Sequence, residues 1–181
     1  MELPVEDGLR LRTLDNGDVA ELHGLVERDR DHLSPWLPWA AAQTPLQTAE
    51  FVRKARLQAE LEEGLEAAVE RDGRIVGMAG LHAVDWDNRS AALGYWLARS
   101  EQGRGTMTLA VGALLDHAFC TWELNRVEVR CALGNERSRR IPERLGFTKE
   151  GVARESQRFG DRYLDSVVYA LLAREWAPPR S

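Results

Sequence analysis

The chain has 181 residues, of which 44% are hydrophobic and 29% charged, a composition that suits one packed domain and excludes a largely disordered protein. Lys and Arg number 24 against 29 Asp and Glu, and the resulting net charge of −5 argues against nucleic acid as the main partner. The chain contains no run of ~18 apolar residues and no signal-like N-terminus, so we expect a cytoplasmic protein with no membrane partner.

The first half of the chain predicts a strand, two helices and an antiparallel meander. Alternating apolar and polar residues predict the strands, and apolar residues at spacings of three and four predict the helices. Asp72-Gly73 is a typical two-residue hairpin turn. In chain order we expect a strand at 8–14, helices at 18–33 and 45–64, and strands at 65–70, 74–81 and 91–98.

The second half predicts a helix, a strand, a short helix and a final hairpin around Gly160-Asp161. This order favours a mixed α/β sandwich over a doubly wound parallel sheet. We expect residues 1–176 to form one domain and 177–181 to be a flexible tail. The elements expected here lie at 106–122, 126–132, 138–145 and 152–172.

The two cysteines, Cys120 and Cys131, belong to no Cys-x-x-Cys pair. No spacing of histidines or acidic residues indicates a metal site. We therefore expect two reduced, space-filling thiols and no bound metal.

The segment from Ser100 to Thr108 joins an expected strand to an expected helix and contains Gly103 and Gly105. Glycines let backbone N–H groups face a ligand, and the helix adds unpaired N–H donors at its start. The pattern is compatible with binding of a diphosphate and also with a simple tight turn.

Two sequence blocks resemble the GNAT N-acetyltransferases, in particular their RimJ/RimL-type branch. In the first block, GYWLARSEQGRGTMTLAVGALLDHAF, Gln102 and Gly105 match the superfamily loop, and Met107 matches the RimL-type variant of it. The second block, LNRVEVRCALGNERSRRIPERLGFTKEGV, is similar to the second cofactor-side motif of the family.

The resemblance implies an α/β (α+β) GNAT fold with a twisted mixed sheet of about six or seven strands and about four helices. The sheet would be splayed between its fourth and fifth strands, with acetyl-CoA wedged in the gap. The backbone of Leu97 would bind the pantetheine arm and thioester, and Asn135 would contact the arm from the other side. The nucleotide phosphates would be contacted by Arg104, Arg137 or Arg140. The alternative for each of these arginines is a solvated surface charge. The residues implied to hold the pyrophosphate are Gln102, Gly103, Arg104, Gly105, Thr106, Met107 and Thr108.

Many GNAT enzymes protonate the departing thiolate with a Tyr, but Pro142 occupies that position here. The resemblance therefore points to Ser138, which would hydrogen-bond the sulfur or relay a proton through water. Because Pro142 lacks an N–H, it also frees the carbonyl of Ser138 for another partner. The alternative role for Ser138 is to cap the helix.

The general base is less clearly indicated, because Gln157 stands where RimL-type enzymes can place a Glu. We take His82 as the candidate general base instead, since imidazole titrates near neutral pH. The alternative is that His82 is a packed or surface residue with no catalytic role. Asp85, Glu155 and a chain of waters stay open as further candidates.

Trp36 and Trp39 lie where the resemblance places the acceptor-side loop, as an apolar wall or as anchors of the loop. We expect direct acetyl transfer from acetyl-CoA to a primary amine, with a ribosomal-protein N-terminus as the favoured acceptor. Two alternatives stay open: a small-molecule amine as the acceptor, and a catalytically silent module that binds acyl-CoA. The protein could in addition form a homodimer.

Overall fold

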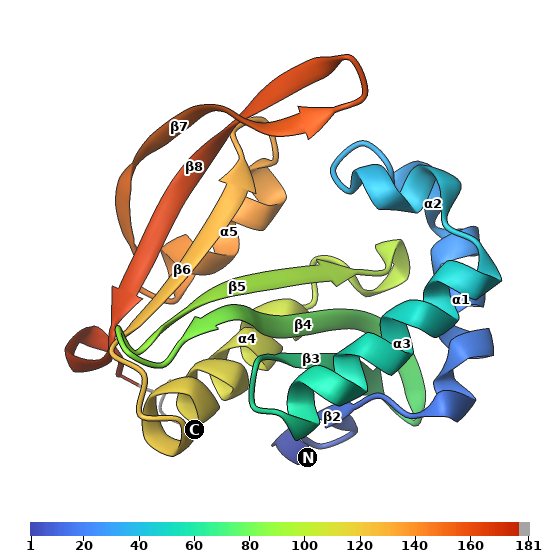
Figure 1. Cartoon of the computed structure of the whole chain (residues 1–181), viewed down its shortest axis with the longest axis horizontal. Helices are drawn as coiled ribbons and strands as arrows, with labels where there is room; N and C mark the ends of the chain where they lie inside the picture. The colour runs from blue at the N-terminus through green and yellow to red at the C-terminus, as the bar shows by residue number, and fades with distance from the viewer. Residues whose placement is uncertain (178–181) are drawn as a thin grey trace.

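The computed structural model describes residues 1–177, and all its strands belong to one sheet with helices on both faces (Figure 1). The strands are β1 (Glu2–Glu6), β2 (Leu9–Thr13), β3 (Leu65–Arg71), β4 (Arg74–Asp85), β5 (Ser90–Leu97), β6 (Arg126–Ala132), β7 (Thr148–Phe159) and β8 (Arg162–Leu172). The helices are α1 (Val19–Arg28), α2 (Arg30–Leu33), α3 (Pro45–Glu60), α4 (Thr106–Asp116) and α5 (Glu136–Arg144).

The strand order is β1-β2-β3-β4-β5-β6-β8-β7, and β5 and β6 form the one parallel pair among the described strands. This arrangement confirms the mixed sheet and excludes a doubly wound one. Since β1 precedes the first expected strand, the fourth and fifth expected strands are β5 and β6, and these two diverge along their length (Figure 1).

The sheet has eight strands rather than the expected six or seven. The additional strand, β1, pairs antiparallel with β2 through a turn in which Gly8 has a φ of +73°. The Asp7-Gly8 pair between two short apolar-alternating runs was the sequence signal for this hairpin.

The expected helix over 18–33 is divided into α1 and α2 at Asp29. The Asp29 carboxylate accepts a hydrogen bond from the backbone N–H of Arg99 at 2.6 Å, and its φ of −104° departs from the helical value. A second expected helix, 106–122, also differs from its prediction, because it is α-helical to Asp116 and continues as a π-helical turn over His117–Thr121. The break between α1 and α2 thus coincides with a contact to a residue distant in sequence, which periodicity alone does not reveal.

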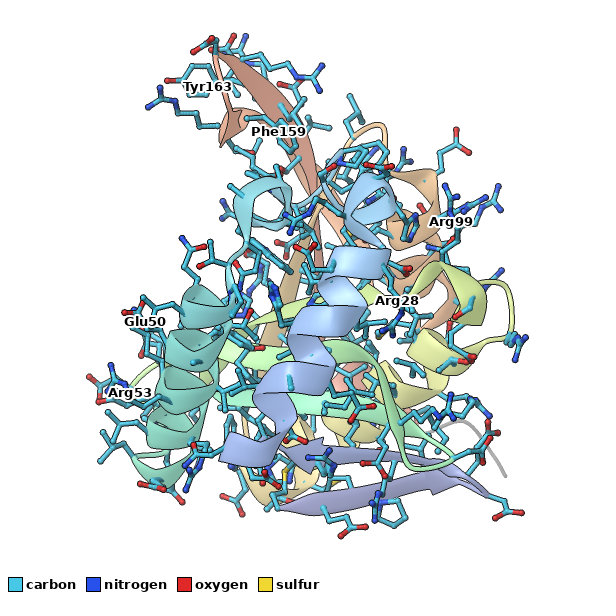
Figure 2. The ribbon with its side chains drawn as sticks, turned by 90° about the vertical axis from the view of Figure 1, so that its right-hand side faces the viewer. Arg28, Glu50, Arg53, Arg99, Phe159 and Tyr163 are labelled. Atoms are coloured by element: carbon cyan, nitrogen blue, oxygen red, sulfur yellow. The ribbon has the colours of Figure 1, made fainter. Side chains whose placement is uncertain are left out.

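Two apolar layers sandwich the sheet. On β3, Leu65 and Val69 pack in the cluster that includes α4, whereas Ala68 packs on the opposite face with Leu22 of α1 and Val52 of α3. Figure 2 shows α1 and α3 covering that face, with Glu50 and Arg53 on the outer side of α3. The face below α1 and α3 contains the cavity described next.

None of the helices in residues 1–177 is long and apolar enough to cross a membrane. The single domain proposed for 1–176 stays a prediction. The expected flexible tail, 177–181, falls almost entirely outside the described residues.

Candidate active site

The parting of β5 and β6 creates the central feature of the site. Ser90–Leu93 pair with Arg126–Val129, and β5 then continues to Leu97 without a partner on that side among the described residues. The other edge of this stretch stays bonded to β4, where Leu97 lies opposite Gly77. Backbone groups of β5 beyond Leu93 are therefore open to an extended ligand.

The loop at the end of β5 has the geometry of an anion site. Gly103 and Gly105 have φ values of +78° and +81°, and a Cβ built on either would have no atom within 4 Å. The first N–H bonded within α4 is that of Leu109, to the carbonyl of Gly105, so the N–H groups of residues 106–108 have no helical acceptor. The turn therefore presents unpaired backbone N–H donors of the kind that bind anions.

Gln102 connects two elements across the loop. Its Oε1 accepts a hydrogen bond from Arg137 of α5 at 2.5 Å, and its Nε2 lies 2.8 Å from Nε2 of His32 in α2. Arg104 and Arg140 instead pair weakly with Glu101 and Glu136 and are largely exposed. Of the three arginines expected near the phosphates, the side chain of Arg137 is the one held against the loop.

The helix α5 is capped by Asn135 and not by Ser138. The Oδ1 of Asn135 accepts a hydrogen bond from the N–H of Ser138 at 3.2 Å, which corrects the capping alternative for the serine. The Ser138 hydroxyl is thus free to face other groups.

Three hydroxyl and thiol groups meet beside the gap. The Ser138 Oγ lies 3.3 Å from Sγ of Cys131 and 3.4 Å from the hydroxyl of Tyr95. The Tyr95 hydroxyl donates a hydrogen bond of 2.8 Å to the Ser138 carbonyl, the group that Pro142 leaves without a helical partner. Burial raises the pKa of both Tyr95 and Cys131, so both are protonated at neutral pH.

Sequence reasoning did not predict that Tyr95 and Cys131 lie beside Ser138. Both cysteines are free, as expected, and the buried Cys131 fills space in the core, whereas the exposed Cys120 does not, which corrects that part of the expectation. The available signal was the position of Tyr95 on the strand that precedes the glycine loop.

A cavity of about 410 Å³ lies below α1 and α3, against β3, β4 and β5. Trp39 and Trp96 form part of its wall with their ring centroids 6.0 Å apart in an edge-on arrangement. Trp36 is not among the described lining residues, and its ring lies against Gly134 instead. The lining consists of Leu22, Val26, Leu37, Trp39, Gln43, Gln47, Thr48, Phe51, Glu66, Met78, His82, Gly94, Tyr95 and Trp96.

His82, the expected general base, is one of the residues that line this cavity. Desolvation lowers its pKa, so the ring is neutral at pH 7. Asp85, Glu155 and Gln157 are not part of the described lining, and the Asp85 carboxylate is occupied by Asn88.

Glu66 on β3 is a lining residue that sequence reasoning missed. Burial raises its pKa from the usual 4.5 to about 7. Within residues 1–177, no three His, Cys, Asp or Glu side chains cluster closely enough to hold a metal ion.

The chain belongs to the GNAT acetyltransferases, because the profile of the acetyltransferase (GNAT) domain matches residues 8–148. It is 38% identical over 176 residues to YdaF of Bacillus subtilis, provisionally named a ribosomal N-acetyltransferase, with 95% of each chain covered. It is 25% identical to the ribosomal-protein-serine acetyltransferase of Escherichia coli, over 93% of this chain and 94% of that protein.

A solved structure of RimL, a ribosomal-protein α-N-acetyltransferase, in complex with coenzyme A matches with a TM-score of 0.91. The sequence identity is 26%, and the match covers 95% of this chain and 98% of that one. These comparisons confirm the GNAT fold, the RimJ/RimL-type resemblance and the acetyl-CoA-dependent N-acetyltransferase class.

Proposed function

We propose that the acceptor is the N-terminal α-amine of a protein, with a ribosomal protein as the first candidate. The proposal rests on the geometry of β5, whose unpaired edge meets the cavity at Gly94, Tyr95 and Trp96. A thioester lying along β5 would thus reach an amine bound in the cavity. The named activities of the bacterial relatives support the ribosomal acceptor.

The charge of the cavity supports an α-amine over a polyamine. Glu66 is the one carboxylate among its described lining residues, whereas a polyamine carries several cationic centres. An α-amine has a pKa of about 7.7–8.0, well below the ~10.4 of a lysine-like amine. A substantial fraction of it is therefore neutral near physiological pH and ready to attack.

In this proposal, the backbone of Gln102 to Thr108 holds the pyrophosphate and that of Leu97 aligns the thioester arm. Ser138 hydrogen-bonds the sulfur as it leaves, and Asn135 keeps Ser138 in place by capping α5. His82 faces the amine, and Trp39 forms the apolar wall.

Direct attack without an acyl-enzyme agrees with the state of Cys131. Its thiol is buried and its pKa is raised, so little thiolate is present to act as a nucleophile.

The test is release of coenzyme A thiol from acetyl-CoA with a panel of acceptors. Peptides matching ribosomal-protein N-termini should be acetylated with a higher kcat/KM than N-terminally blocked copies, spermidine or free amino acids. Faster turnover of a small amine would assign the chain to small-molecule acetylation. Calorimetric binding of acetyl-CoA without thiol release for any amine would indicate a silent binding module.

A further inference from the structure

Glu66 differs from the other carboxylate on the same face of β3. Glu70 is bound by Arg12 Nε at 2.5 Å and Arg10 Nε at 2.7 Å, and its pKa is lowered despite burial. Glu66 has a side chain that is 23% exposed, and no hydrogen bond to its carboxylate is made by residues 1–177. Glu66 is one of the residues that line the cavity, and its Oε2 lies over Gly80 of β4. A carboxylate left without a cation in a largely apolar site is costly for stability and indicates a functional role.

The surroundings of Glu66 contain few ionisable groups. His82 on β4 is the nearest, with Nδ1 4.0 Å from Glu66 Oε1, and Tyr95 on β5 is the other titratable lining residue described. The lining residues from α1 and α3 are uncharged. No fixed positive charge therefore holds Glu66 permanently ionised.

Two glycines provide the space for these side chains. Glu66 lies opposite Gly80 in the β3–β4 register, and Gly80 lies opposite Gly94 in the β4–β5 register. A Cβ on Gly80 would come within 2.4 Å of Glu66 Oε2, and one on Gly94 within 3.0 Å of His82 Cε1. The glycines thus let Glu66 and His82 lie across the sheet towards the parted edge of β5.

We propose that Glu66 is the catalytic residue that takes the proton from the acceptor amine, with His82 beside it in the same cavity. This inference rests on the proposed function. An ammonium group entering the cavity gives one proton to the Glu66 carboxylate. The neutral nitrogen then attacks the thioester carbonyl carbon, so the C–N bond forms and the C–S bond breaks. The second proton lost by nitrogen ends on the sulfur, and Glu66 later returns its proton to water.

The experiment measures kcat against pH for the wild-type enzyme and for Glu66→Gln, Glu66→Asp and His82→Gln. In the wild type, kcat should rise with pH through an apparent pKa of about 7, since Glu66 must be ionised to act. Glu66→Gln should lack this limb, and its kcat should be at least ~100-fold lower than that of the wild type. Its affinity for acetyl-CoA should stay within about two-fold of the wild-type value. Glu66→Asp keeps a carboxylate and should retain the limb at reduced kcat.

Glu63→Gln serves as the matched control, because Glu63 is an exposed carboxylate just before β3. Its kcat and pH profile should equal those of the wild type. Two acceptor peptides that differ only in the pKa of their terminal amine show whether the pH-dependent limb of kcat comes from the enzyme or from the substrate. The limb belongs to Glu66 if it stays at the same pH for both peptides.

Full activity in Glu66→Gln, or a limb that moves with the acceptor amine, would overturn the proposal. So would a limb that disappears in His82→Gln but persists in Glu66→Gln, because the base would then be the imidazole. If the wild-type enzyme binds acetyl-CoA but acetylates no amine, the proposed function fails instead, and the two failures are distinguishable.

Discussion

At the scale of single residues, one proline explains how the hydroxyl cluster is built. Pro142 removes the N–H that would bond the Ser138 carbonyl within α5, and Tyr95 of β5 supplies a donor in its place. This bond joins the two sides of the gap between β5 and β6. It also holds a phenol within 3.4 Å of the serine hydroxyl expected to meet the leaving sulfur.

A double-mutant cycle tests this exchange of donors. Tyr95→Phe should lower the free energy of unfolding by about 1–2 kcal/mol, since the Ser138 carbonyl loses its donor in a partly buried place. In a Pro142→Ala background the new backbone N–H can bond the same carbonyl, so Tyr95→Phe should cost about 1 kcal/mol less. Urea unfolding of the four proteins gives the coupling, and strict additivity would contradict it.

The difference in stability between the wild type and Glu66→Gln should depend on pH in a defined direction. The folded pKa of Glu66 is about 7 against a usual value of 4.5, so the folded state binds more protons between these values. Wild-type stability from this group therefore falls as the pH rises from about 4.5 to 7. Glu66→Gln should match the wild type at pH 4.5 and exceed it by up to ~3 kcal/mol at pH 8.

Urea unfolding at the two pH values measures this difference. Asp18 and Glu70 have lowered pKa values and lose their stabilising effect as the pH falls, but they are common to both proteins and cancel. A Glu66→Gln variant that is less stable at pH 8 would mean that the carboxylate has a stabilising partner.

At the scale of elements, the loop between β5 and α4 is both a tight turn and the proposed binding surface for the coenzyme. The left-handed φ of Gly105 places its missing Cβ in open space, so the position is constrained by backbone conformation and not by protein packing. Gly73, in the β3–β4 hairpin, has a nearly identical φ of +76° and equally open surroundings. The two glycines differ in the proposal, because only Gly105 would face the coenzyme.

Gly105→Ala and Gly73→Ala should therefore separate strain from ligand binding. Each should lose about 1 kcal/mol of stability, because alanine is strained in the left-handed region. Only Gly105→Ala should also weaken acetyl-CoA binding, by roughly ten-fold or more (~1.4 kcal/mol), since in the proposed site its methyl group would meet the pyrophosphate. Calorimetric titration checks this, and equal affinities would refute the loop assignment.

At the scale of the whole molecule, the sheet consists of two parts joined by little backbone pairing. β1 to β5 meet β6, β8 and β7 through four paired positions of β5 and β6 (Figure 1). Side chains complete the connection, through Gln102 with Arg137 and through Trp36 against Gly134. A coenzyme lying in the gap would touch both parts.

Acetyl-CoA should consequently stabilise the entire chain against heat. At 100 times its Kd, a ligand of the folded state adds about 2.7 kcal/mol, which corresponds to roughly 5–10 °C in Tm for a chain of this size. Scanning calorimetry with and without acetyl-CoA measures the shift. The Gly105→Ala variant should show a smaller shift at the same concentration, and an unchanged Tm in the wild type would contradict binding in the gap.

The sequence predicted most of the fold because the decisive signals are local. The helix α3 begins at Pro45 after a Thr44 cap, and the β3–β4 hairpin turns at Asp72-Gly73, as their residue types require. The division of α1 from α2 at Asp29 escaped prediction, since the contact at this position is with Arg99, which is distant in sequence.

The amino-acid sequence by itself determined the class of protein, because the glycine loop and the Asn135 to Ser138 motif are continuous stretches whose spacing carries their chemistry. The tertiary structure decided which side chains share the candidate active site. Glu66, His82 and Tyr95 lie on three different strands, and the register of β3, β4 and β5 brings them to one cavity. Hydrogen bonding between strands sets that register over long sequence distances, so no local pattern encodes it.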